Sequence, residues 1–387
     1  MAAQTGVAGP EGDTVKARMQ VREATTDEER ERIFRFRYEG YWEQQRLLPE
    51  LCDHERKTLR DADDAVARLF YVERAGTVLG TLRVNWFADG PVSAATRDLF
   101  GVAPFERSLG TEQMALLSRF IVAPEERGGA CAGLLLLEVA RFGIAKRIHL
   151  AFCDCEPHLM PFYRSIGFRS YKSVVGHATS GVLIPLILVV SDRAYLDRIG
   201  SYLCSLLPDE YPSCPDDVLA LISDGGAQSV GADVDEDQAL TEYRRAADGR
   251  HTLFEGLSDE EVKSLLAKAL VIECAAGDAL ARSDHASKTL YAVLDGVVEV
   301  HRDGQLVSIV GPGELTGEFA FLLGRARTAD LVAATNVRVL ALSDRTLDRV
   351  MLTSPSVAST LMRNLAATLA ERLIRQSARP SGSNAQV

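Results

Sequence analysis

A segment rich in proline, aspartate, glycine and serine divides the sequence of 387 residues into two blocks with different hydrophobic patterns. The segment covers residues 207–249 and is predicted to be a linker with one short helix at "DDVLALIS". Residues 21–206 alternate between helical and strand periodicity, whereas residues 250–376 contain many short strands with glycines at the turns. The pattern predicts an α+β chain, with a mixed sheet and helices, then the linker, then a C-terminal β-roll flanked by helices.

The ends of the chain and its charge narrow the class of protein. Residues 1–20 contain no apolar run of signal-peptide length and are expected to be a disordered leader, and residues 377–387 a disordered tail. The longest apolar run, Gly181–Val190, is far shorter than the roughly 20 residues that span a bilayer. A net charge of −11 disfavours a nucleic-acid partner, because nucleic-acid phosphates bind basic surfaces.

Seven cysteines at irregular spacing indicate reduced thiols rather than a disulfide framework. The Cys153-x-Cys155 spacing on a predicted strand is poor for a zinc site, and reduced structural thiols are the better interpretation. We therefore expect a cytoplasmic protein with no membrane span, no nucleic-acid partner and no metal site.

The stretch "GELTGEFAFLLGRARTADL", Gly313–Leu331, places two opposite charges in apolar surroundings. Glu318 and Arg327 would be costly to desolvate unless they meet each other or a ligand. Gly317 stands at the start of a short predicted helix, whose first N–H groups attract an anion. A phosphate fused to a ribose would satisfy all three residues, and an internal ion pair between Glu318 and Arg327 is the alternative.

This stretch resembles the phosphate-binding cassette of cyclic nucleotide-binding domains. The resemblance implies that Glu318 binds the ribose 2′-hydroxyl and that Arg327 binds the cyclic phosphate of cAMP or cGMP. Thr328 follows the arginine and leaves the choice of base open, while Ala326 replaces the usual proline of the family. The residues that the resemblance assigns to the nucleotide site are Gly317, Glu318, Phe319, Ala320, Arg327 and Thr328.

A second anion site is predicted where a strand runs into a glycine-bearing turn and a helix, Ser118–Ala140. Small residues at the start of the helix expose its amides and the positive end of its dipole, which suits a pyrophosphate. The turn resembles motif A of the GNAT acyltransferases, and "MPFYRSIGF" resembles a later element of that superfamily. The residues that the resemblance assigns to acetyl-CoA or another acyl-CoA are Phe120, Ile121, Val122, Arg127, Gly128, Gly129, Ala130, Cys131 and Ala132.

The GNAT resemblance also implies catalytic residues. Tyr163 would protonate the departing thiolate, with core packing as its alternative role. A base must deprotonate the attacking amine. Glu112 is our candidate, and further candidates are Asp154, Glu156 and His158; each could instead be a solvated surface group.

Part of this block is similar to acyl-homoserine-lactone and N-acyl amino acid synthases. In those families an arginine, an Asp-x-x-Asp pair and a later arginine recur, and the matching positions are Arg37, Asp61, Asp64 and Arg83. Lactone synthases carry a glutamate where this chain has Leu116, which argues against lactone synthesis. Transfer of a longer acyl chain from an acyl carrier protein remains open.

These resemblances predict a GNAT-type N-acyltransferase that moves an acyl group from acyl-CoA to an amine and is regulated by cAMP or cGMP. The amine acceptor would be a protein lysine or a small molecule such as an amino acid. Two alternatives are an N-acyl amino acid synthase that uses acyl carrier protein, and a non-catalytic cyclic nucleotide receptor with a degenerate GNAT fold.

Overall fold

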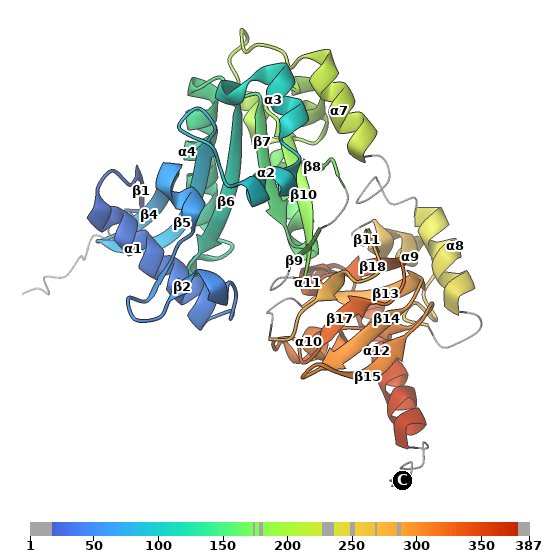
Figure 1. Ribbon diagram of the computed structural model, residues 1–387. Helices are drawn as coiled ribbons and strands as arrows, with labels where there is room; N and C mark the ends of the chain where they lie inside the picture. The colour runs from blue at the N-terminus through green and yellow to red at the C-terminus, as the bar shows by residue number, and fades with distance from the viewer. Residues whose placement is uncertain are drawn as a thin grey trace, which may run out of the picture.

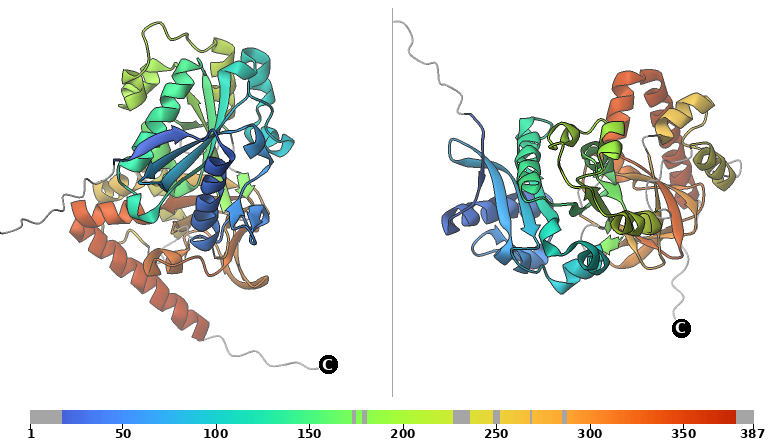
Figure 2. Two further views of the ribbon diagram at one scale, coloured as in Figure 1. Left: turned by 90° about the vertical axis from the view of Figure 1, so that its left-hand side faces the viewer. Right: turned by 90° about the horizontal axis from the view of Figure 1, so that it is seen from above.

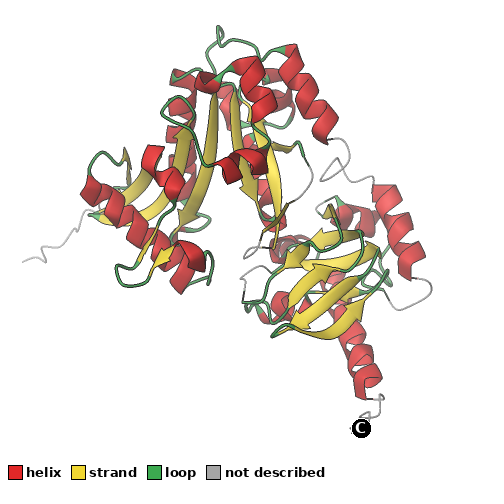
Figure 3. Ribbon diagram, viewed as in Figure 1, coloured by secondary structure: helices red, strands yellow, loops and turns green. Residues whose placement is uncertain are grey.

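The computed structural model describes residues 18–172, 175–177, 181–226, 236–247, 252–267, 269–284 and 288–377. Figure 1 shows one large sheet with helices in the N-terminal half and a compact β-roll with helices in the C-terminal half. Figure 3 shows that helices and strands both contribute throughout the chain. The predicted α+β class is therefore confirmed.

The N-terminal sheet has the strand order β1-β4-β5-β6-β7-β10-β8, with β9 paired to β10. Only β6 and β7 are parallel; the other pairs described in this sheet are antiparallel. The strands of this half, including the separate β2–β3 pair, are β1 (Gln20–Glu23), β2 (Cys52–Asp53), β3 (Thr58–Leu59), β4 (Arg68–Arg74), β5 (Thr77–Trp86), β6 (Met114–Val122), β7 (Leu150–Cys155), β8 (Arg169–Ser170), β9 (Val175–His177) and β10 (Gly181–Val189). The predicted hairpin at Ala75–Gly76 is present, and both residues have the positive φ that a tight two-residue turn requires.

Helices cover both faces of this sheet. They are α1 (Asp27–Arg37), α2 (Ala94–Phe100), α3 (Ala103–Leu109), α4 (Ala130–Ala145), α5 (Met160–Ile166), α6 (Arg193–Arg198) and α7 (Asp216–Gly226). Leu135 and Val139 of α4 are buried in the core of one face, whereas Phe105 of α3 and Val218 of α7 are buried on the other. Successive side chains of a strand point to opposite faces of the sheet, so alternate residues pack in the two cores.

The helix predicted at "DEERERIFRFRYEGYWEQQR" changes character partway. It begins with a capping box between Thr26 and Glu29 and continues beyond α1 as a π-helical turn, Tyr38–Glu43. Gly40 in that turn lies against β6, where a Cβ atom would come within 2.4 Å of the Ile121 side chain. The wider π turn therefore brings the backbone close to β6, and such turns are frequent at functional sites.

The C-terminal roll consists of two four-stranded sheets with the orders β11-β18-β13-β16 and β12-β17-β14-β15. Its strands are β11 (Leu270–Cys274), β12 (Ala279–Ala281), β13 (Leu290–Asp295), β14 (Val298–Arg302), β15 (Gln305–Val310), β16 (Leu315–Thr316), β17 (Asp330–Ala333) and β18 (Val337–Leu342). Its helices are α9 (Asp259–Leu266), α10 (Glu318–Leu323), α11 (Asp344–Thr353) and α12 (Pro355–Ser377). In the side view of Figure 2, α12 reaches well beyond the roll.

The segment expected to be a linker, 207–249, contains more structure than its composition predicts. It holds α7 and a further helix, α8 (Glu236–Ala247), which lies beside the roll in Figure 1. Leu240 and Tyr243 of α8 are buried in the core of the roll. Gly313 makes this contact possible, because a Cβ atom there would come within 2.4 Å of the Ala246 carbonyl oxygen. The predicted domain limits 21–206 and 250–376 stay predictions. Helix α8 packs against the domain predicted for residues 250–376.

The two halves of the molecule share buried apolar contacts. Val182 and Ile184 of β10 belong to the same buried cluster as Leu280 and Ala281 of β12. In Figure 1 the lower end of the large sheet, where β9 and β10 lie, faces the roll. The large sheet of the N-terminal half and the roll are therefore in direct apolar contact.

No helix in the described part of the chain is long and apolar enough to cross a membrane. Among the same residues, no group of three or more histidine, cysteine, aspartate or glutamate side chains could hold a metal ion. All seven cysteines are free thiols.

Candidate functional site

The first candidate site lies where β6 and β7 separate. Their parallel pairing joins Met114–Leu116 to Leu150–Phe152, although β6 continues to Val122 and β7 to Cys155. Beyond the paired residues no pairing joins the two strands, and we call this unpaired edge of β6 the opening. An extended thiol-ester arm can lie along such an edge and bond to its main chain.

A β-bulge shapes β6 at this opening. On β5, Thr81 pairs with Ile121 and Arg83 pairs with Ser118, so β6 carries one extra residue between them. Arg119 has a φ of 54°, a left-handed conformation that is uncommon for a residue other than glycine. Bulges of this kind redirect side chains beside active sites. Here the bulge directs Arg119 toward a cluster of charged residues.

Five charged side chains form a continuous hydrogen-bonded relay, which we call the arginine relay. Arg37 donates to Asp64 at 2.8 Å, and Arg83 lies 3.2 Å from the other oxygen of Asp64. Arg83 also donates to Asp61 Oδ1 at 2.5 Å, and Arg119 donates to Asp61 Oδ2 at 2.5 Å. The structure thus brings together all four residues expected from the synthase resemblance and adds Arg119.

Local structure holds the two carboxylates of the relay in place. Asp61 caps the short helix Ala62–Val66, and the Asp64 carboxylate accepts a hydrogen bond from the Asp61 amide at 2.9 Å. This capping box points both carboxylates at the same region. Arg37 is the last residue of α1, and Arg83 lies in the middle of β5.

The arginine relay contains three guanidinium groups but two carboxylates, so it carries one positive charge in excess. The Arg37 side chain is fully buried, and its Nε and Nη2 have no hydrogen-bond partner. Arg119 Nε is also buried without a partner, yet one fifth of the Arg119 side chain reaches solvent. A buried excess charge with unpaired donors favours the binding of an anion.

The pKa shifts in the relay follow from this charge distribution. Burial opposes ionisation of Asp61, but the Arg83 and Arg119 guanidiniums outweigh it and lower the pKa of Asp61 to about 2. Burial likewise opposes ionisation of Asp64, and Arg37 and Arg83 lower its pKa. Both carboxylates are therefore ionised at neutral pH.

Tyr163 lies near the opening, among aromatic side chains. Its ring packs edge-on against Phe162 and Phe168, at centroid distances of 5.4 and 5.6 Å. Burial raises the pKa of Tyr163 well above its usual value, and the Asp154 charge raises it further. The tyrosine is therefore protonated at neutral pH, as a proton donor to a departing thiolate must be.

The candidate bases occupy different places. Asp154 lies on β7 between two buried cysteines, so its side chain points to the face opposite α4. Burial raises the pKa of Tyr41, and the charges of Arg119, Arg37, Arg83 and Asp154 also act on this pKa. Asp154 therefore lies near the relay. Glu156 follows β7, and the His158 side chain lies outside the described residues.

Glu112, the candidate base named from the sequence, lies at the start of β6 and not at its far end. It is exposed in the short helix Thr111–Gln113, before β6 begins. At about 3.3 Å per residue, the length of β6 separates it from the far end of that strand. The sequence indicated that Glu112 precedes β6, but not that β6 and β7 are still paired there.

The predicted pyrophosphate turn has the expected backbone. Gly128 has a φ of 80°, and α4 begins after Gly129 without a side-chain cap, so the first amides of α4 are available. Arg127 bends back to donate from Nε to the Val122 carbonyl at 3.2 Å.

Some of the side chains assigned to acyl-CoA are buried, and others are partly exposed. Cys131 is completely buried, and its sulfur would be 2.9 Å from a Cβ atom at Gly80, so only its backbone can face a cofactor. Ile121 is buried under Gly40. Phe120 is half-buried and stacks on Phe162 at 6.2 Å. Its ring is the one best placed to contact a pantetheine arm.

An apolar cavity of about 50 Å³ lies on the α4 face of the sheet. Small residues leave this space, among them Ala115 on β6, Ala151 on β7 and Gly143 on α4. A cavity lined in this way stays dry and accepts hydrocarbon.

The second candidate site surrounds Arg327 in the roll. Arg327 is buried and donates from Nη2 to the Thr289 carbonyl at 2.5 Å and from Nη1 to the Gly317 carbonyl at 3.3 Å. Its guanidinium also lies over the Tyr291 ring, at 5.4 Å. Gly317 has a φ of 86°, and a Cβ atom there would come within 2.2 Å of Arg327 Nη1. The glycine is thus required both by its conformation and by this close approach.

Glu318 does not pair with Arg327. Its carboxylate accepts a hydrogen bond from Arg372 of α12, which also donates to the Leu315 carbonyl at 2.5 Å. Glu318 is almost completely buried, whereas about a quarter of the Arg372 side chain is exposed. The alternative of an internal Glu318–Arg327 ion pair therefore does not hold in this structure.

Other residues near Arg327 complete the pocket. Ala320 is buried, whereas Phe319 and Thr328 are exposed at its rim. Burial lowers the pKa of the Arg327 guanidinium, and the charges of Glu318 and Glu156 oppose that shift. Glu156 follows β7, so the N-terminal half of the molecule approaches this pocket.

Two residues of the candidate sites, Arg372 and Arg119, were assigned no role from the sequence. Arg372 reaches Glu318 from a helix far along the chain, and no spacing pattern links the two. Arg119 was visible as part of a Ser-Arg step in β6, but its direction depends on the bulge.

Two family models match parts of this chain. Residues 32–191 match the family "N-acyl amino acid synthase FeeM", and residues 271–354 match the family "Cyclic nucleotide-binding domain". The first match includes the whole arginine relay and Tyr163, and the second includes Glu318 and Arg327.

Individual relatives cover smaller parts of the chain. Glutaminase 2 of Bradyrhizobium diazoefficiens is 31% identical over 132 residues, which is 34% of this chain and 21% of the glutaminase. The chain thus spans about a fifth of the length of that relative.

Three solved structures are among those similar to part of this chain. The N-terminal domain of a transcriptional regulator from Streptomyces coelicolor A3(2) is 34% identical, covers 35% of this chain and 97% of its own, and has a TM-score of 0.29. The catabolite activator protein of Thermus thermophilus is 32% identical, with coverages of 32% and 59% and a TM-score of 0.29. A cyclic nucleotide-binding domain from Methylobacillus flagellatus KT is 22% identical, with coverages of 39% and 88% and a TM-score of 0.35.

Proposed function

Because the chain joins an acyltransferase domain of the FeeM N-acyl amino acid synthase family to a cyclic nucleotide-binding domain, we propose that it is an N-acyl amino acid synthase controlled by cAMP or cGMP. The observation that carries the acceptor is the excess positive charge of the arginine relay. A free amino acid brings both the amine that attacks and a carboxylate that can balance this charge. A protein lysine brings the amine alone.

In this proposal Arg119 binds the acceptor carboxylate. It is the relay arginine that reaches solvent, and it lies on the bulge of β6 beside the opening. Asp61 holds one side of its guanidinium, while Nε is unpaired. Guanidinium groups bind carboxylates through two parallel hydrogen bonds, which fixes the orientation of the amino acid and thereby of its amine.

The acyl thioester lies along the edge of β6 in the opening. The attacking amine forms a bond to the carbonyl carbon, the C–S bond breaks, and the thiolate receives a proton from Tyr163. Asp154, on the relay-facing side of β7, takes the proton that the amine loses. Most of the rate acceleration comes from positioning and from main-chain donors at the carbonyl oxygen.

The acyl donor is either acyl-CoA or an acyl carrier protein, because both present the same pantetheine arm. The uncapped start of α4 after Gly129 suits a phosphate of either donor. The apolar cavity behind β6 provides space for part of a hydrocarbon chain longer than acetyl. We expect chains longer than acetyl to be the better substrates.

Control by nucleotide rests on the roll. Arg327 binds the cyclic phosphate in place of its present carbonyl partners, and Glu318 accepts the ribose hydroxyl. The apolar contact between β10 and β12 connects the roll to the sheet that carries the acyl site. A ligand shifts the equilibrium between two arrangements only if it binds one of them better.

The test is an assay of purified full-length protein with acyl-CoA or acyl carrier protein as donor and a mixture of amino acids as acceptors. Mass spectrometry should detect N-acyl amino acids, at a rate that changes when cAMP or cGMP is added. Equal rates at saturating nucleotide would overturn the regulation. Acylation of lysine peptides alone would overturn the acceptor class, and no product with any donor would favour the non-catalytic receptor.

Amino acid amides provide a sharper test of the acceptor site, because they lack the carboxylate. The wild-type protein should prefer the acid over the amide by about tenfold or more in kcat/KM, as expected for a lost charge-assisted bond. Arg119→Gln should remove this preference, whereas Arg141→Gln, on the exposed side of α4, should preserve it. A preference that survives Arg119→Gln would contradict the assignment.

A further inference from the structure

Tyr41 lies in the π-helical turn Tyr38–Glu43, directly after α1. Its neighbour Gly40 packs against Ile121 of β6. Ile121 is the residue at which β6 resumes its pairing with β5 after the bulge that carries Arg119. The turn therefore brings Tyr41 to the same end of β6 as Arg119.

The electrostatic neighbours of Tyr41 place its side chain beside the arginine relay. Burial raises the pKa of Tyr41, and the Arg119 charge opposes this shift more than any other charge does. Burial also opposes the charge on Arg119, but Asp61 and, after it, Tyr41 outweigh burial and raise the pKa of Arg119. Tyr41 is therefore close to Arg119, and its hydroxyl is protonated at neutral pH.

The hydroxyl of Tyr41 is available to a ligand. It forms no hydrogen bond within the part of the chain that the structure describes, and the side chain is half-buried. Tyr38 of the same turn differs, because its hydroxyl is paired with Nδ1 of His54 at 3.0 Å. Since tyrosine hydroxyls at apolar sites usually find a partner, the Tyr41 hydroxyl is the one of this pair that a bound molecule can use.

Two parts of the proposed reactants come near this hydroxyl: the acceptor carboxylate at Arg119 and the thioester at Tyr163. Burial raises the pKa of Tyr163, and Tyr41 is the last of the groups that add to this shift. Arg119, by contrast, is the first of the charges that act on Tyr41. The hydroxyl is thus better placed for the carboxylate than for the thioester.

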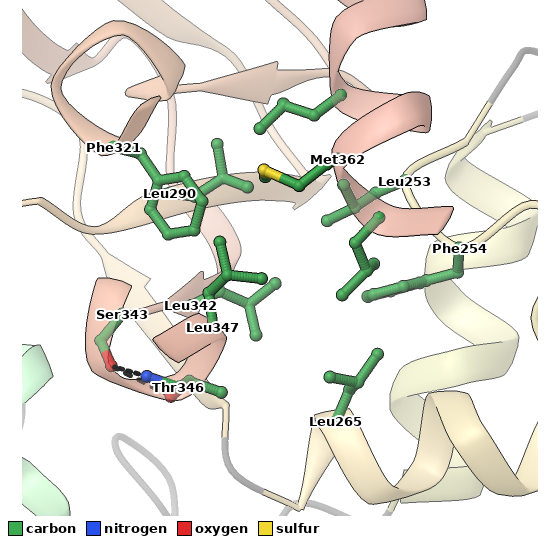
Figure 4. A pocket seen from close by; sticks show the side chains of 12 residues that line it. Leu253, Phe254, Leu265, Leu290, Phe321, Leu342, Ser343, Thr346, Leu347 and Met362 are labelled. Carbon is green, nitrogen blue, oxygen red and sulfur yellow. Dashed lines mark hydrogen bonds between the residues drawn. The ribbon is translucent and has the colours of Figure 1, made fainter. Parts of the chain in front are cut away.

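Two apolar cavities do not suit a carboxylate. One lies behind β6, and the other lies in the roll, where Figure 4 shows Leu290, Phe321 and Met362 pointing into a space of about 30 Å³. Among the described residues, neither cavity is lined by a charged side chain. In the roll cavity, the hydroxyls of Ser343 and Thr346 are hydrogen-bonded to each other at 3.0 Å. An ion without a partner there would pay the full cost of desolvation.

We propose that the Tyr41 hydroxyl donates a hydrogen bond to the carboxylate of the amino acid acceptor, beside Arg119. The inference rests on the acceptor site of the proposed function and adds a second group to it. A carboxylate has about four positions that accept hydrogen bonds, so it can accept two from a guanidinium and a third from a hydroxyl. Tyr41 keeps its proton throughout, so it selects and orients the acceptor without taking part in proton transfer.

Tyr41→Phe removes the hydroxyl and keeps the ring. Because the carboxylate is unchanged during acyl transfer, the lost bond should raise KM for the amino acid by about fivefold and leave kcat nearly the same. The amino acid amide lacks the carboxylate, so its kcat/KM should not change. The preference for the acid over the amide should therefore fall by about fivefold, the usual effect of one hydrogen bond.

The two residues of the site should act as a unit. In Arg119→Gln the carboxylate is no longer held beside Tyr41, so adding Tyr41→Phe to this variant should not change the preference further. Tyr38→Phe is the matched control, since it removes a hydroxyl from the same turn whose partner is His54. It should keep the wild-type KM and the wild-type preference.

The experiment is steady-state kinetics of the full-length protein with octanoyl-CoA or octanoyl acyl carrier protein at saturation. The acceptors are the amino acid that gives the most product from a mixture and the α-amide of the same amino acid. Thermal unfolding of each variant and its rate with the amide show whether the acyl site is intact. The amide rate therefore keeps the test decisive even if Tyr41→Phe is less stable.

The outcomes separate the inference from the function on which it rests. If Arg119→Gln loses the preference and Tyr41→Phe keeps it, Tyr41 does not bind the carboxylate and the proposed acceptor class stands. If Tyr41→Phe lowers kcat equally for acid and amide, the hydroxyl or the ring serves the reaction itself, and the inference is wrong. An equal loss of preference in Tyr38→Phe would assign the effect to the turn as a whole and also overturn it. If the wild type forms no N-acyl amino acid, the inference and the proposed function both fail.

Discussion

The two charged sites of this chain are balanced in opposite ways. In the arginine relay, three guanidiniums share two carboxylates, and buried donors of Arg37 and Arg119 remain unpaired. In the nucleotide pocket, Glu318 is paired with Arg372 and Arg327 is bonded to two carbonyls. The first site is prepared for an anion that the protein does not supply. The second has internal partners for Glu318 and for two of the three Arg327 nitrogens, while Arg327 Nε is buried without one, so its ligand meets groups that the protein already holds in part.

This difference suits the two roles that we propose. A catalytic site gains from groups fixed in advance, because little reorganisation is then needed during the reaction. A regulatory site gains from an internal partner, because the ligand then changes the contacts of the protein when it binds. The following predictions test whether the two sites differ in this way, from the largest expected effect to the smallest.

Asp61→Asn tests the relay most severely. It leaves Arg83 and Arg119 close together without their shared carboxylate, so the free energy of unfolding should fall by about 3 kcal/mol, as for other broken buried ion pairs. Urea unfolding followed by circular dichroism measures the change. Asp53→Asn, at an exposed position outside the relay, is the control and should have little effect. Equal stability of both variants would mean that the relay is not a single electrostatic unit.

Arg327→Ala tests the pocket. Loss of the two-pronged bond to the cyclic phosphate should weaken cAMP and cGMP binding by about 100-fold. Arg325→Ala removes an exposed arginine two positions away and should leave the affinity unchanged. Calorimetry gives both values, and retained binding by Arg327→Ala would refute the pocket assignment. In Arg327→Ala the carbonyls of Thr289 and Gly317 also lose the donor that they have in the wild type. Thermal unfolding should therefore be recorded for each variant.

Acid pH should weaken the relay. The pKa of Asp61 is about 2 in the folded protein against 3.8 as a reference for the unfolded chain. Its ionised form therefore contributes stability above pH 4, and that contribution, about 2 kcal/mol, is lost as the pH falls from 4 toward 2. Unfolding free energies measured across this range should fall more steeply for the wild type than for Asp61→Asn. Parallel curves would argue against the pKa shift.

Tyr163→Phe separates chemistry from regulation. Removing the hydroxyl should lower kcat by about tenfold to 100-fold, because a thiolate can also take its proton from water. Nucleotide affinity and thermal stability should hardly change, since the ring packing against Phe162 and Phe168 is retained. A variant with the full wild-type kcat would return Tyr163 to a purely structural role.

The sequence was most informative where function depends on neighbouring residues. The order Gly317, Glu318 and Arg327 indicated the nucleotide pocket, because the helix start and the loop after it place these residues locally. The glycine turn before α4 was informative for the same reason. In both cases the backbone conformation follows from a short stretch of chain.

Contacts between distant segments were beyond the sequence. Arg372 meets Glu318 only because α12 packs along the roll, and Arg119 meets Asp61 only because β6 bulges. The apolar side of α8 was hidden within a segment whose average composition resembles a linker. The distance of Glu112 from the far end of β6 was not predictable either, because the place where β6 and β7 separate depends on strand pairing rather than on motif spacing.

The position of β10 has a practical consequence for anyone who divides this protein. The strand pairs with β7 next to the acyl site, and its first residues, Val182 and Ile184, are covered by the roll. Removing the C-terminal half would expose the apolar side chains at the start of β10 to solvent. A truncated enzyme that loses activity would therefore report damage to its own sheet, so point substitutions in the intact chain are the safer way to study regulation.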